Sequence, residues 1–372
     1  MQYRRFGQTE LNFSVFSLGT MRSLVNPDNF RQTLEAAFEL GINHIETARG
    51  YGQSELYIGS SLKELGYKRA DFYITSKIPP TSEPHKIRAW LEESLSLLQL
   101  EYLDCLAIHG INTWEHLDWV KQDCMPVLDA LRKEGFFNHL GFSTHGPLDL
   151  ILSAIDTGYF SFLNLHYYYF FQHNQPAIEL AKARDLGIFI ISPADKGGLL
   201  HQPSELLKEL CHPLTPLEFN YLFLLEDPAI STLSFGPASP LETKIPSLDQ
   251  YSSQNCMAIA RRLEAQLQKR LSTDLCSQCY QCLPCPENIN IPEVLRLRNL
   301  ALAFDMQQYA QYRYGMFEKA GHWFPGKKAN NCSQCGDCLP RCPEQLKIPD
   351  LLFDAHNTLN VGESRRLWEN EN

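Results

Sequence analysis

The segment SLGTMRS, residues 17–23, decides between the two folds that the rest of the sequence allows. It contains the end of the first predicted strand, FSVFSL at 13–18, and the turn that follows. In an open, doubly wound sheet this turn usually carries a G-x-G-x-x-G sequence that approaches a phosphate. SLGTMRS lacks that pattern. A closed barrel of parallel strands surrounded by helices is therefore preferred, and the open sheet remains the second choice.

The first 250 residues repeat one unit, in which a short apolar run is followed by a loop and an amphipathic stretch. The other predicted strands lie at 43–47, 71–76, 104–109, 138–143, 161–166, 188–192 and 230–235. The predicted helices lie near 28–40, 54–65, 84–98, 124–134, 147–157, 175–186 and 215–227. The glycines that follow helices, as left-handed caps do, are Gly41, Gly66, Gly135, Gly158 and Gly187. Eight strands alternating with helices predict an α/β fold, a (β/α)8 TIM barrel, over residues 1–250.

The composition is that of an ordinary globular protein, with 44% hydrophobic and 20% charged residues among 372. The net charge of −10 argues against a nucleic-acid partner, because binding to phosphates requires clustered Lys and Arg. The sequence has no secretory signal and no long apolar run, so we expect no membrane partner and a cytoplasmic location. The 12 cysteines are then expected to be thiols or metal ligands rather than disulfides.

Eight of the cysteines fall in two groups, CSQCYQCLPCP at 276–286 and CSQCGDCLPRCP at 332–343. Each group has three cysteines at two-residue spacing and a fourth followed by proline, a pattern that indicates [4Fe–4S] ligation. Zinc sites usually use two separated C-x2-C pairs, so zinc and free thiols are less favoured alternatives. The predicted ligands of two [4Fe–4S] clusters are Cys276, Cys279, Cys282, Cys285, Cys332, Cys335, Cys338 and Cys342.

A matching phrase follows each cysteine group, ENINIPEVL at 287–295 and EQLKIPDLL at 344–352, and the two phrases extend an internal repeat. We therefore predict a small, mainly helical iron–sulfur domain at 276–355. Residues 251–275 have apolar residues at helical spacing and are predicted to form a connecting helix. The remaining residues, 356–372, are predicted to form a C-terminal tail.

Four ionisable residues lie at the ends of three consecutive predicted strands or in the loop just beyond. Glu46 and Tyr51 come from HIETARGYG, Lys77 ends ITSK, and His109 ends LAIH. Catalytic residues of a barrel lie at the carboxyl ends of its strands, so these side chains are expected to converge. A lysine beside a tyrosine is expected to lower the tyrosine pKa, and a histidine can hold a carbonyl oxygen in line. Such a set suits proton transfer to a developing alkoxide.

At these positions the sequence resembles the aldo/keto reductase superfamily, over residues 1 to about 245. Tyr51, Lys77 and His109 match the family's catalytic pattern, and Glu46 stands where the family usually has Asp. The resemblance implies a nicotinamide cofactor, with NADP(H) as the family default and NAD(H) as the alternative. The residues that it implies for cofactor binding are Ser143, Asn164, Ser192, Gly236 and Ser239.

The cofactor region departs from the family pattern at two positions. Ile191 replaces a tyrosine that stacks on nicotinamide, and Glu242 falls about where an arginine often binds the 2′-phosphate. A carboxylate there would repel that phosphate, which keeps NAD(H) open. The cysteine-rich segment, in turn, resembles a two-cluster ferredoxin-type module over residues 270 to about 355. That resemblance implies that the fourth cysteine of each group ligates the other group's cluster.

Two functions follow from these patterns. The first is a carbonyl oxidoreductase that transfers hydride between the nicotinamide and an aldehyde or ketone, with Tyr51 as the general acid. The second is an electron-transfer or redox-sensing protein in which the barrel serves as a docking scaffold. The expected partners are a small carbonyl substrate and a possible redox protein. Nicotinamide gives two electrons and each cluster carries one, so the sequence leaves the role of the clusters open.

Overall fold

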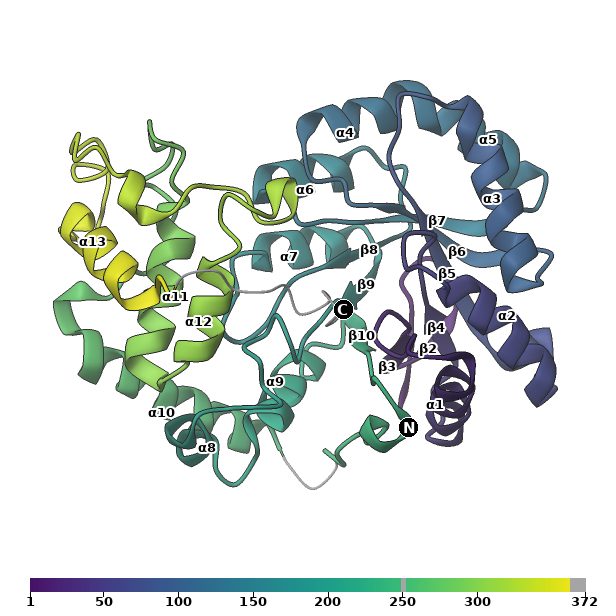
Figure 1. Ribbon diagram of the computed structural model, residues 1–372, viewed down its shortest axis with the longest axis horizontal. Coiled ribbons are helices and arrows are strands. Elements are labelled where there is room, and N and C mark those ends of the chain that lie inside the picture. Colours follow the sequence, from purple (N-terminus) through teal and green to yellow (C-terminus); the bar gives the residue numbers. More distant parts are fainter. Residues whose placement is uncertain (249–251, 362–372) are drawn as a thin grey trace. The chain divides into compact units, whose positions relative to one another are not determined.

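The computed structural model describes residues 1–248 and 252–361, and Figure 1 shows its course. Residues 249–251, at the predicted junction of barrel and connecting helix, and 362–372 of the predicted tail lie outside the described residues. The chain separates into two compact units. The first comprises Met1–Gly197 and Phe223–Leu248, and the second comprises Gly198–Leu222 and the described residues 252–361.

A closed barrel of eight parallel strands forms the first unit, in the order β10-β3-β4-β5-β6-β7-β8-β9. The strands are β3 (Phe16–Gly19), β4 (His44–Glu46), β5 (Tyr73–Ile78), β6 (Leu103–His109), β7 (Phe137–Ser143), β8 (Phe162–Leu165), β9 (Gly187–Ile190) and β10 (Ile230–Phe235). Each strand pairs in parallel with both neighbours, so the predicted (β/α)8 barrel is confirmed over the open sheet.

Helices surround the barrel and connect its strands. They are α1 (Pro27–Glu39), α2 (Ser54–Leu65), α3 (His85–Leu98), α4 (Trp114–Trp119), the π-helical turn η2 (Val120–Cys124), α5 (Met125–Lys133), α6 (Leu148–Asp156), α7 (Gln175–Ala183) and the short η1 (Arg69–Asp71) and η3 (Pro240–Glu242). The helix between β9 and β10, α9 (Pro216–Leu225), belongs to the second unit up to Leu222. Of the five predicted glycine caps, four have positive φ. Gly187 is the exception and begins β9, where a Cβ would lie 2.5 Å from the Phe6 ring. Its role is close packing, not helix capping.

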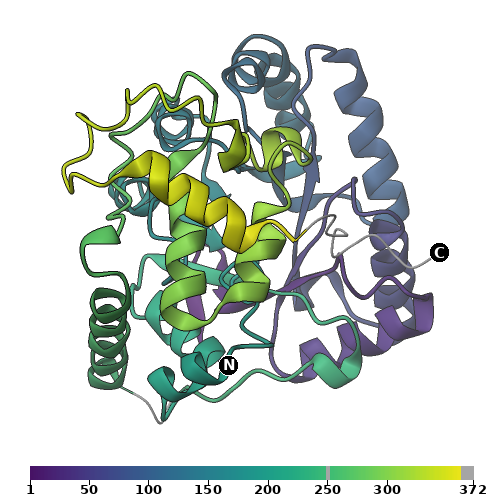
Figure 2. The same ribbon diagram turned by 60° about the vertical axis from the view of Figure 1, so that its left-hand side comes forward.

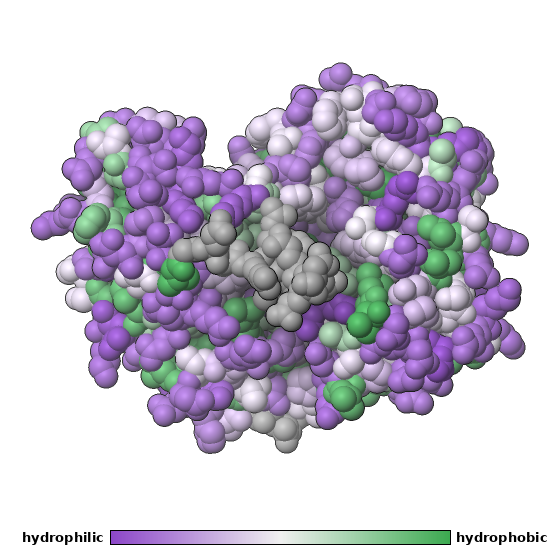
Figure 3. All heavy atoms as spheres, in the orientation of Figure 1, coloured by the Kyte–Doolittle hydropathy of each residue, from purple (hydrophilic) through white to green (hydrophobic). Residues whose placement is uncertain are grey.

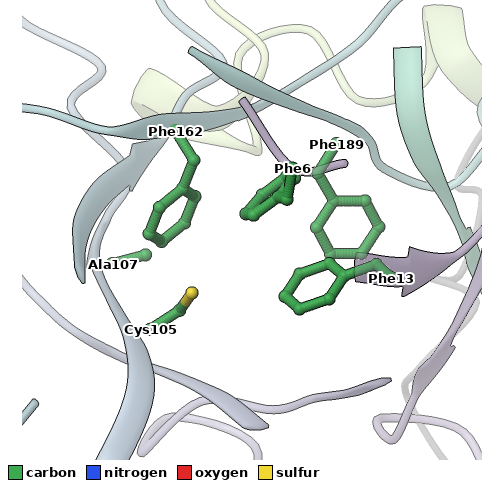
Figure 4. Close-up of a cluster of buried hydrophobic side chains, with 6 residues drawn as sticks. All are labelled: Phe6, Phe13, Cys105, Ala107, Phe162 and Phe189. Carbon is green, nitrogen blue, oxygen red and sulfur yellow. The ribbon is translucent and has the colours of Figure 1, made fainter. Parts of the chain in front are cut away.

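The first predicted strand, 13–18, divides into two elements. β2 (Asn12–Ser14) pairs antiparallel with β1 (Tyr3–Arg5), and only β3 enters the barrel. The β1–β2 hairpin brings Phe6 and Phe13 onto the barrel interior, where Phe162, Phe189, Cys105 and Ala107 pack around them (Figure 4). Phe13 also stacks on His44, with ring centroids 3.9 Å apart. Because Phe162 and His44 begin their strands, the hairpin closes the amino-terminal end and leaves the carboxyl ends for the site.

The second unit is mainly helical, as predicted, and its centre is α11 (Ile291–Phe304). Nearly every residue of α11 is buried, because α10 (Ser253–Leu271), α12 (Gln307–Tyr314) and α13 (Ile348–Leu359) all pack against it (Figures 1 and 2). The unit's other helical segments are α8 (Glu205–Cys211), η4 (Ser272–Asp274), η5 (Gly321–Trp323) and η6 (Ala329–Asn331). The repeated I-P-E/D sequence begins α11 and α13 alike.

The visible surface is mainly hydrophilic, with smaller apolar patches scattered across it (Figure 3). Within residues 1–248 and 252–361, no helix is both long and apolar enough to cross a membrane.

Candidate functional site

Three neighbouring strands carry the four predicted catalytic residues to the same end of the barrel. Glu46 ends β4, Lys77 is the second-last residue of β5, and His109 ends β6. Tyr51 lies in the loop between β4 and α2, where its backbone N–H donates to the carbonyl of Ala48. Parallel pairing of β4 with β5, and of β5 with β6, holds the three strand ends side by side.

Lys77 is the centre of this group. Its ammonium forms an ion pair with Glu46, and the two side chains are only 1% and 5% exposed. The same nitrogen donates to the carbonyl of Thr47 at 2.8 Å and to the hydroxyl of Tyr51 at 3.2 Å. An ammonium has three protons, so Glu46, Thr47 and Tyr51 use all of them. The lysine is therefore fixed in position and charged, with the tyrosine hydroxyl as one of its three partners.

His109 is a second neighbour of Tyr51. The two rings meet edge to face, with centroids 5.6 Å apart and planes at 83°. Gly50 is also nearby, since a Cβ on it would be in ordinary van der Waals contact with the His109 imidazole, at 3.9 Å. Tyr51 thus contacts both a lysine ammonium and an imidazole, and the four predicted residues form one contiguous group.

Burial decides the protonation states of this group. It raises the pKa of Tyr51, and the opposing effect of Lys77 does not outweigh it. The expectation that Lys77 lowers the tyrosine pKa overall is therefore wrong. Burial destabilises the phenolate more than the neighbouring ammonium stabilises it, so the net pKa of Tyr51 rises. The phenol keeps its proton at neutral pH, which is the form that an acid needs.

Lys77 stays charged and His109 stays neutral, although both side chains are buried. Burial disfavours the ammonium of Lys77, but Glu46 and Tyr51 outweigh it and raise the lysine pKa. Burial, together with the charges of Lys77 and Lys196, lowers the pKa of His109 to about 3. His109 is neutral at physiological pH, so it can donate one N–H without adding charge.

His44 lies one layer deeper in the barrel and was not singled out from the sequence. Its ring nitrogens hydrogen-bond to the hydroxyls of Ser17 at 2.6 Å and Thr75 at 2.8 Å. Burial and the charge of Lys77 lower its pKa to about 3, so it too is neutral. It supports the layer beneath Glu46 and Lys77.

The predicted cofactor residues lie at the ends of the other strands. Ser143 ends β7 and pairs in register with Asn164 of β8. The Ser143 hydroxyl accepts from the N–H of Gly110 at 3.0 Å. Among the described residues, neither polar atom of the fully buried Asn164 amide has a hydrogen-bond partner. A buried amide in that state is costly unless a ligand supplies a donor and an acceptor.

The remaining cofactor positions lie in the loops after β9 and β10. Ser192 follows β9 with φ of 52°, and Gly236 follows β10. Ser239 begins the short helix η3. Because β7, β8, β9 and β10 are consecutive in the barrel, these positions continue around the mouth from the catalytic group.

Glu242, at the end of η3, is engaged by its surroundings. Its carboxylate accepts from the N–H of Ala238 at 3.0 Å and pairs with Arg22 at 3.2 Å. Arg22 also donates to the carbonyl of Gly236 at 2.8 Å. The loop after β10 therefore presents a paired carboxylate and guanidinium, not an unpaired arginine.

A second group of hydrogen-bonded side chains lies at this mouth, and the sequence motifs did not predict it. Tyr168 donates its hydroxyl proton to the carbonyl of Ile191 and accepts from Nδ1 of His166. Nε2 of His166 lies 2.9 Å from Nδ1 of His145. The two histidines, His166 and His145, come two residues after Asn164 and Ser143, which pair in register, and that common offset was the only signal in the sequence.

In the second unit, the eight predicted ligand cysteines line two hollows. The first hollow is lined by Cys276, Cys279 and Cys282 from the first group and by Cys342 from the second. The second hollow is lined by Cys332, Cys335 and Cys338 from the second group and by Cys285 from the first. We call these the first and the second cluster site. All eight cysteines are free thiols, and each site draws on both groups.

Comparison with known proteins agrees with both units. The profile of the Aldo/keto reductase family matches residues 15–211, and that of the 4Fe-4S dicluster domain matches residues 275–347. L-galactose dehydrogenase of Arabidopsis thaliana is 30% identical over 235 residues, which cover 58% of this chain and 71% of that protein. The uncharacterized oxidoreductase YqkF of Bacillus subtilis is 22% identical over 318 residues, or 76% of this chain and 99% of that protein.

Solved structures show the same fold. The holo form of aldo-keto reductase AKR11C1 from Bacillus halodurans matches with a TM-score of 0.61 at 20% identity, over 70% of this chain and 96% of that one. A putative aldo-keto reductase from Pseudomonas aeruginosa matches with a TM-score of 0.52 at 23% identity, over 70% and 95%. The chain therefore belongs to the aldo/keto reductase family and carries a C-terminal 4Fe-4S dicluster domain.

Proposed function

We propose that this oxidoreductase reduces an aldehyde or ketone with a nicotinamide cofactor and that Tyr51 is the general acid. The observation that carries the proposal is the arrangement around Lys77, whose ammonium binds the Tyr51 hydroxyl and the Glu46 carboxylate at once. A protonated phenol held by a fixed cation is suited to give its proton to a developing alkoxide. The cation then stabilises the negative charge left on the phenolate oxygen.

Each residue of the group has one task. Tyr51 donates the proton, and Lys77 lowers the cost of its loss. Glu46 keeps Lys77 charged and oriented, and neutral His109 donates an N–H to the carbonyl oxygen. A bound nicotinamide supplies the hydride. The substrate is expected to be a small carbonyl compound that reaches both Tyr51 and His109.

The buried amide of Asn164 supports nicotinamide binding. Its unpartnered donor and acceptor match the acceptor and donor of a carboxamide, and the hydroxyl of its neighbour Ser143 adds a third polar contact. Ser192, Gly236 and Ser239 are proposed to complete the cofactor site in the adjoining loops. Glu242 sits in the last of these loops with its charge already shared with Arg22. We propose NADP(H) or NAD(H), with the choice between them set in this loop.

We further propose that the second unit binds two [4Fe–4S] clusters, one in each cluster site. Four thiols around one hollow are the donor set that a cubic cluster requires. In this arrangement the fourth cysteine of each group, Cys285 or Cys342, serves the other group's cluster. Since each cluster carries one electron, a one-electron redox protein is proposed as a further partner.

Replacing Tyr51 by Phe tests the catalytic assignment. Carbonyl reduction by Tyr51→Phe should fall about 10²–10⁴-fold, because one positioned acid is lost. Nicotinamide binding, measured by quenching of protein fluorescence under anaerobic conditions, should stay near the wild-type value. A variant that keeps most of its turnover would refute Tyr51 as the acid. Failure of the wild-type protein to bind NADPH or NADH would instead favour an electron-transfer or redox-sensing role.

A further inference from the structure

The two cluster sites have matching cysteines. In the internal repeat, Cys276, Cys279 and Cys282 correspond to Cys332, Cys335 and Cys338. Corresponding cysteines have the same degree of exposure: partly buried, exposed and buried in that order. The crossing cysteines, Cys342 and Cys285, are both partly buried. Solvent exposure of the thiolates therefore gives no reason for the two clusters to differ.

The residues around the cysteines do differ. Gln278 and Gln334 occupy the same place in the repeat, and their backbones have nearly the same φ, 61° and 59°. The Gln278 amide donates to the sulfur of Cys276 at 3.4 Å and to the carbonyl of Pro292 at 3.0 Å. The side chain of Gln334 is exposed and makes no hydrogen bond within the described residues. Within residues 1–248 and 252–361, only the first cluster site thus has a side-chain N–H on a ligand sulfur.

Among the described residues, a buried ion pair also lies beside the first cluster site, whereas Arg341, the cation that lines the second hollow, is only partly buried and so is better screened by water. Glu293 and Arg296 of α11 are joined by two hydrogen bonds, of 2.8 and 2.6 Å, and their side chains are only 6% and 7% exposed. They directly follow Pro292 and Leu295, which line the first hollow. The corresponding residues of α13 are Asp350, which is exposed, and Phe353, which is 70% exposed.

We propose that Gln278 and Arg296 make the cluster of the first site the more positive of the two in reduction potential. Reduction adds one negative charge to a cluster that is already anionic. An N–H directed at a ligand sulfur and a buried cation both favour the more negative state, and so raise the potential. Glu293 offsets part of the effect of Arg296. Electrons that reach the unit would then collect on the first site. This inference rests on the proposed binding of two clusters.

Anaerobic redox titration followed by electron paramagnetic resonance tests the proposal. Wild-type protein is first shown to hold about eight irons per chain, and it should then give two reduction waves. Gln278→Met keeps the length of the side chain and removes the donor, so the more positive wave should move to lower potential. Gln334→Met makes the same change at the matched position and should leave both waves in place.

Glu293→Gln supplies a second test that does not depend on Gln278. It removes the carboxylate that offsets Arg296, so the more positive wave should move further up. A single wild-type wave for two clusters would overturn the proposal. So would a Gln278→Met variant that shifts only the more negative wave or shifts neither. An iron content of about four in the wild type would refute the two-cluster assignment itself, which separates the two failures.

Discussion

The side chains of the barrel site bind one another, whereas the cysteines of the second unit surround two hollows. Lys77 uses its three protons on Glu46, Thr47 and Tyr51, so the catalytic group is complete in the protein alone. The eight thiols have no comparable partners among themselves and form no disulfide. Folding alone forms the catalytic group of the barrel, whereas each cluster site is completed by the cluster that it is proposed to bind. We therefore expect folding of the second unit to be coupled to metal binding.

The largest expected effect comes from breaking the buried pair in the barrel. Lys77→Met should lower the free energy of unfolding of the barrel by about 3–5 kcal/mol, because it leaves the Glu46 carboxylate buried and unpaired. Denaturant unfolding followed by circular dichroism measures this loss. The double variant with Glu46→Gln should be more stable than Lys77→Met alone. Equal stability of the single and double variants would mean that the pair is not a structural element of the barrel.

Acid should weaken the barrel through His44. Its pKa is about 3 in the folded protein against 6.5 for an ordinary histidine, so the unfolded chain binds a proton that the folded chain does not. Stability contributed by the neutral ring is full above pH 6.5 and is lost as the pH falls towards 3, by roughly 4 kcal/mol at pH 3. His44→Gln should flatten the dependence of the unfolding free energy on pH in this range. An unchanged slope would show that His44 does not carry the acid sensitivity.

His356 of the second unit is the matched control for this comparison. It hydrogen-bonds to Tyr314 at 2.7 Å, and burial lowers its pKa, but its side chain is only partly buried. His356→Gln should therefore alter the pH dependence of stability less than His44→Gln does. The reverse order would place the acid-sensitive element in the second unit.

The smallest effect concerns the cofactor loop. Glu242→Arg should shift the ratio of the dissociation constants for NADPH and NADH by about tenfold towards NADPH, because a carboxylate is exchanged for a group that pairs with phosphate. Fluorescence quenching with each nucleotide gives the ratio. Glu242→Gln should shift it less, since it only removes the repulsion. An unchanged ratio for both variants would exclude Glu242 from cofactor selection.

Much of the barrel was predictable because strand and helix periodicity is local. The predicted strand 230–235 and helix 54–65 agree with β10 and α2 residue for residue. The N-terminal hairpin was missed because Val15 divides one apolar run into two strands that go to different sheets. That choice depends on the packing of Phe6 and Phe13 inside the barrel, which no local pattern reveals.

In the candidate sites, too, local features were predictable and features that depend on long-range packing were not. Glu46, Lys77 and His109 could be predicted because each lies at or next to the end of a strand, and Tyr51 because it follows Glu46 in the adjoining loop. The protonation of Tyr51 could not, because it depends on how far burial outweighs Lys77. The chain of His145, His166 and Tyr168 joins β7, β8 and the loop after β9 only in three dimensions.

The most direct test of the contrast between the two units is an iron count on two double variants. If each cluster is shared by both cysteine groups, Cys276→Ala with Cys342→Ala damages one site and should leave about four irons per chain. Cys276→Ala with Cys285→Ala damages both sites and should leave almost none. The barrel should stay folded in both, as judged by nicotinamide binding. The opposite pattern would contradict shared ligation: Cys276→Ala with Cys285→Ala would keep iron, and Cys276→Ala with Cys342→Ala would lose it.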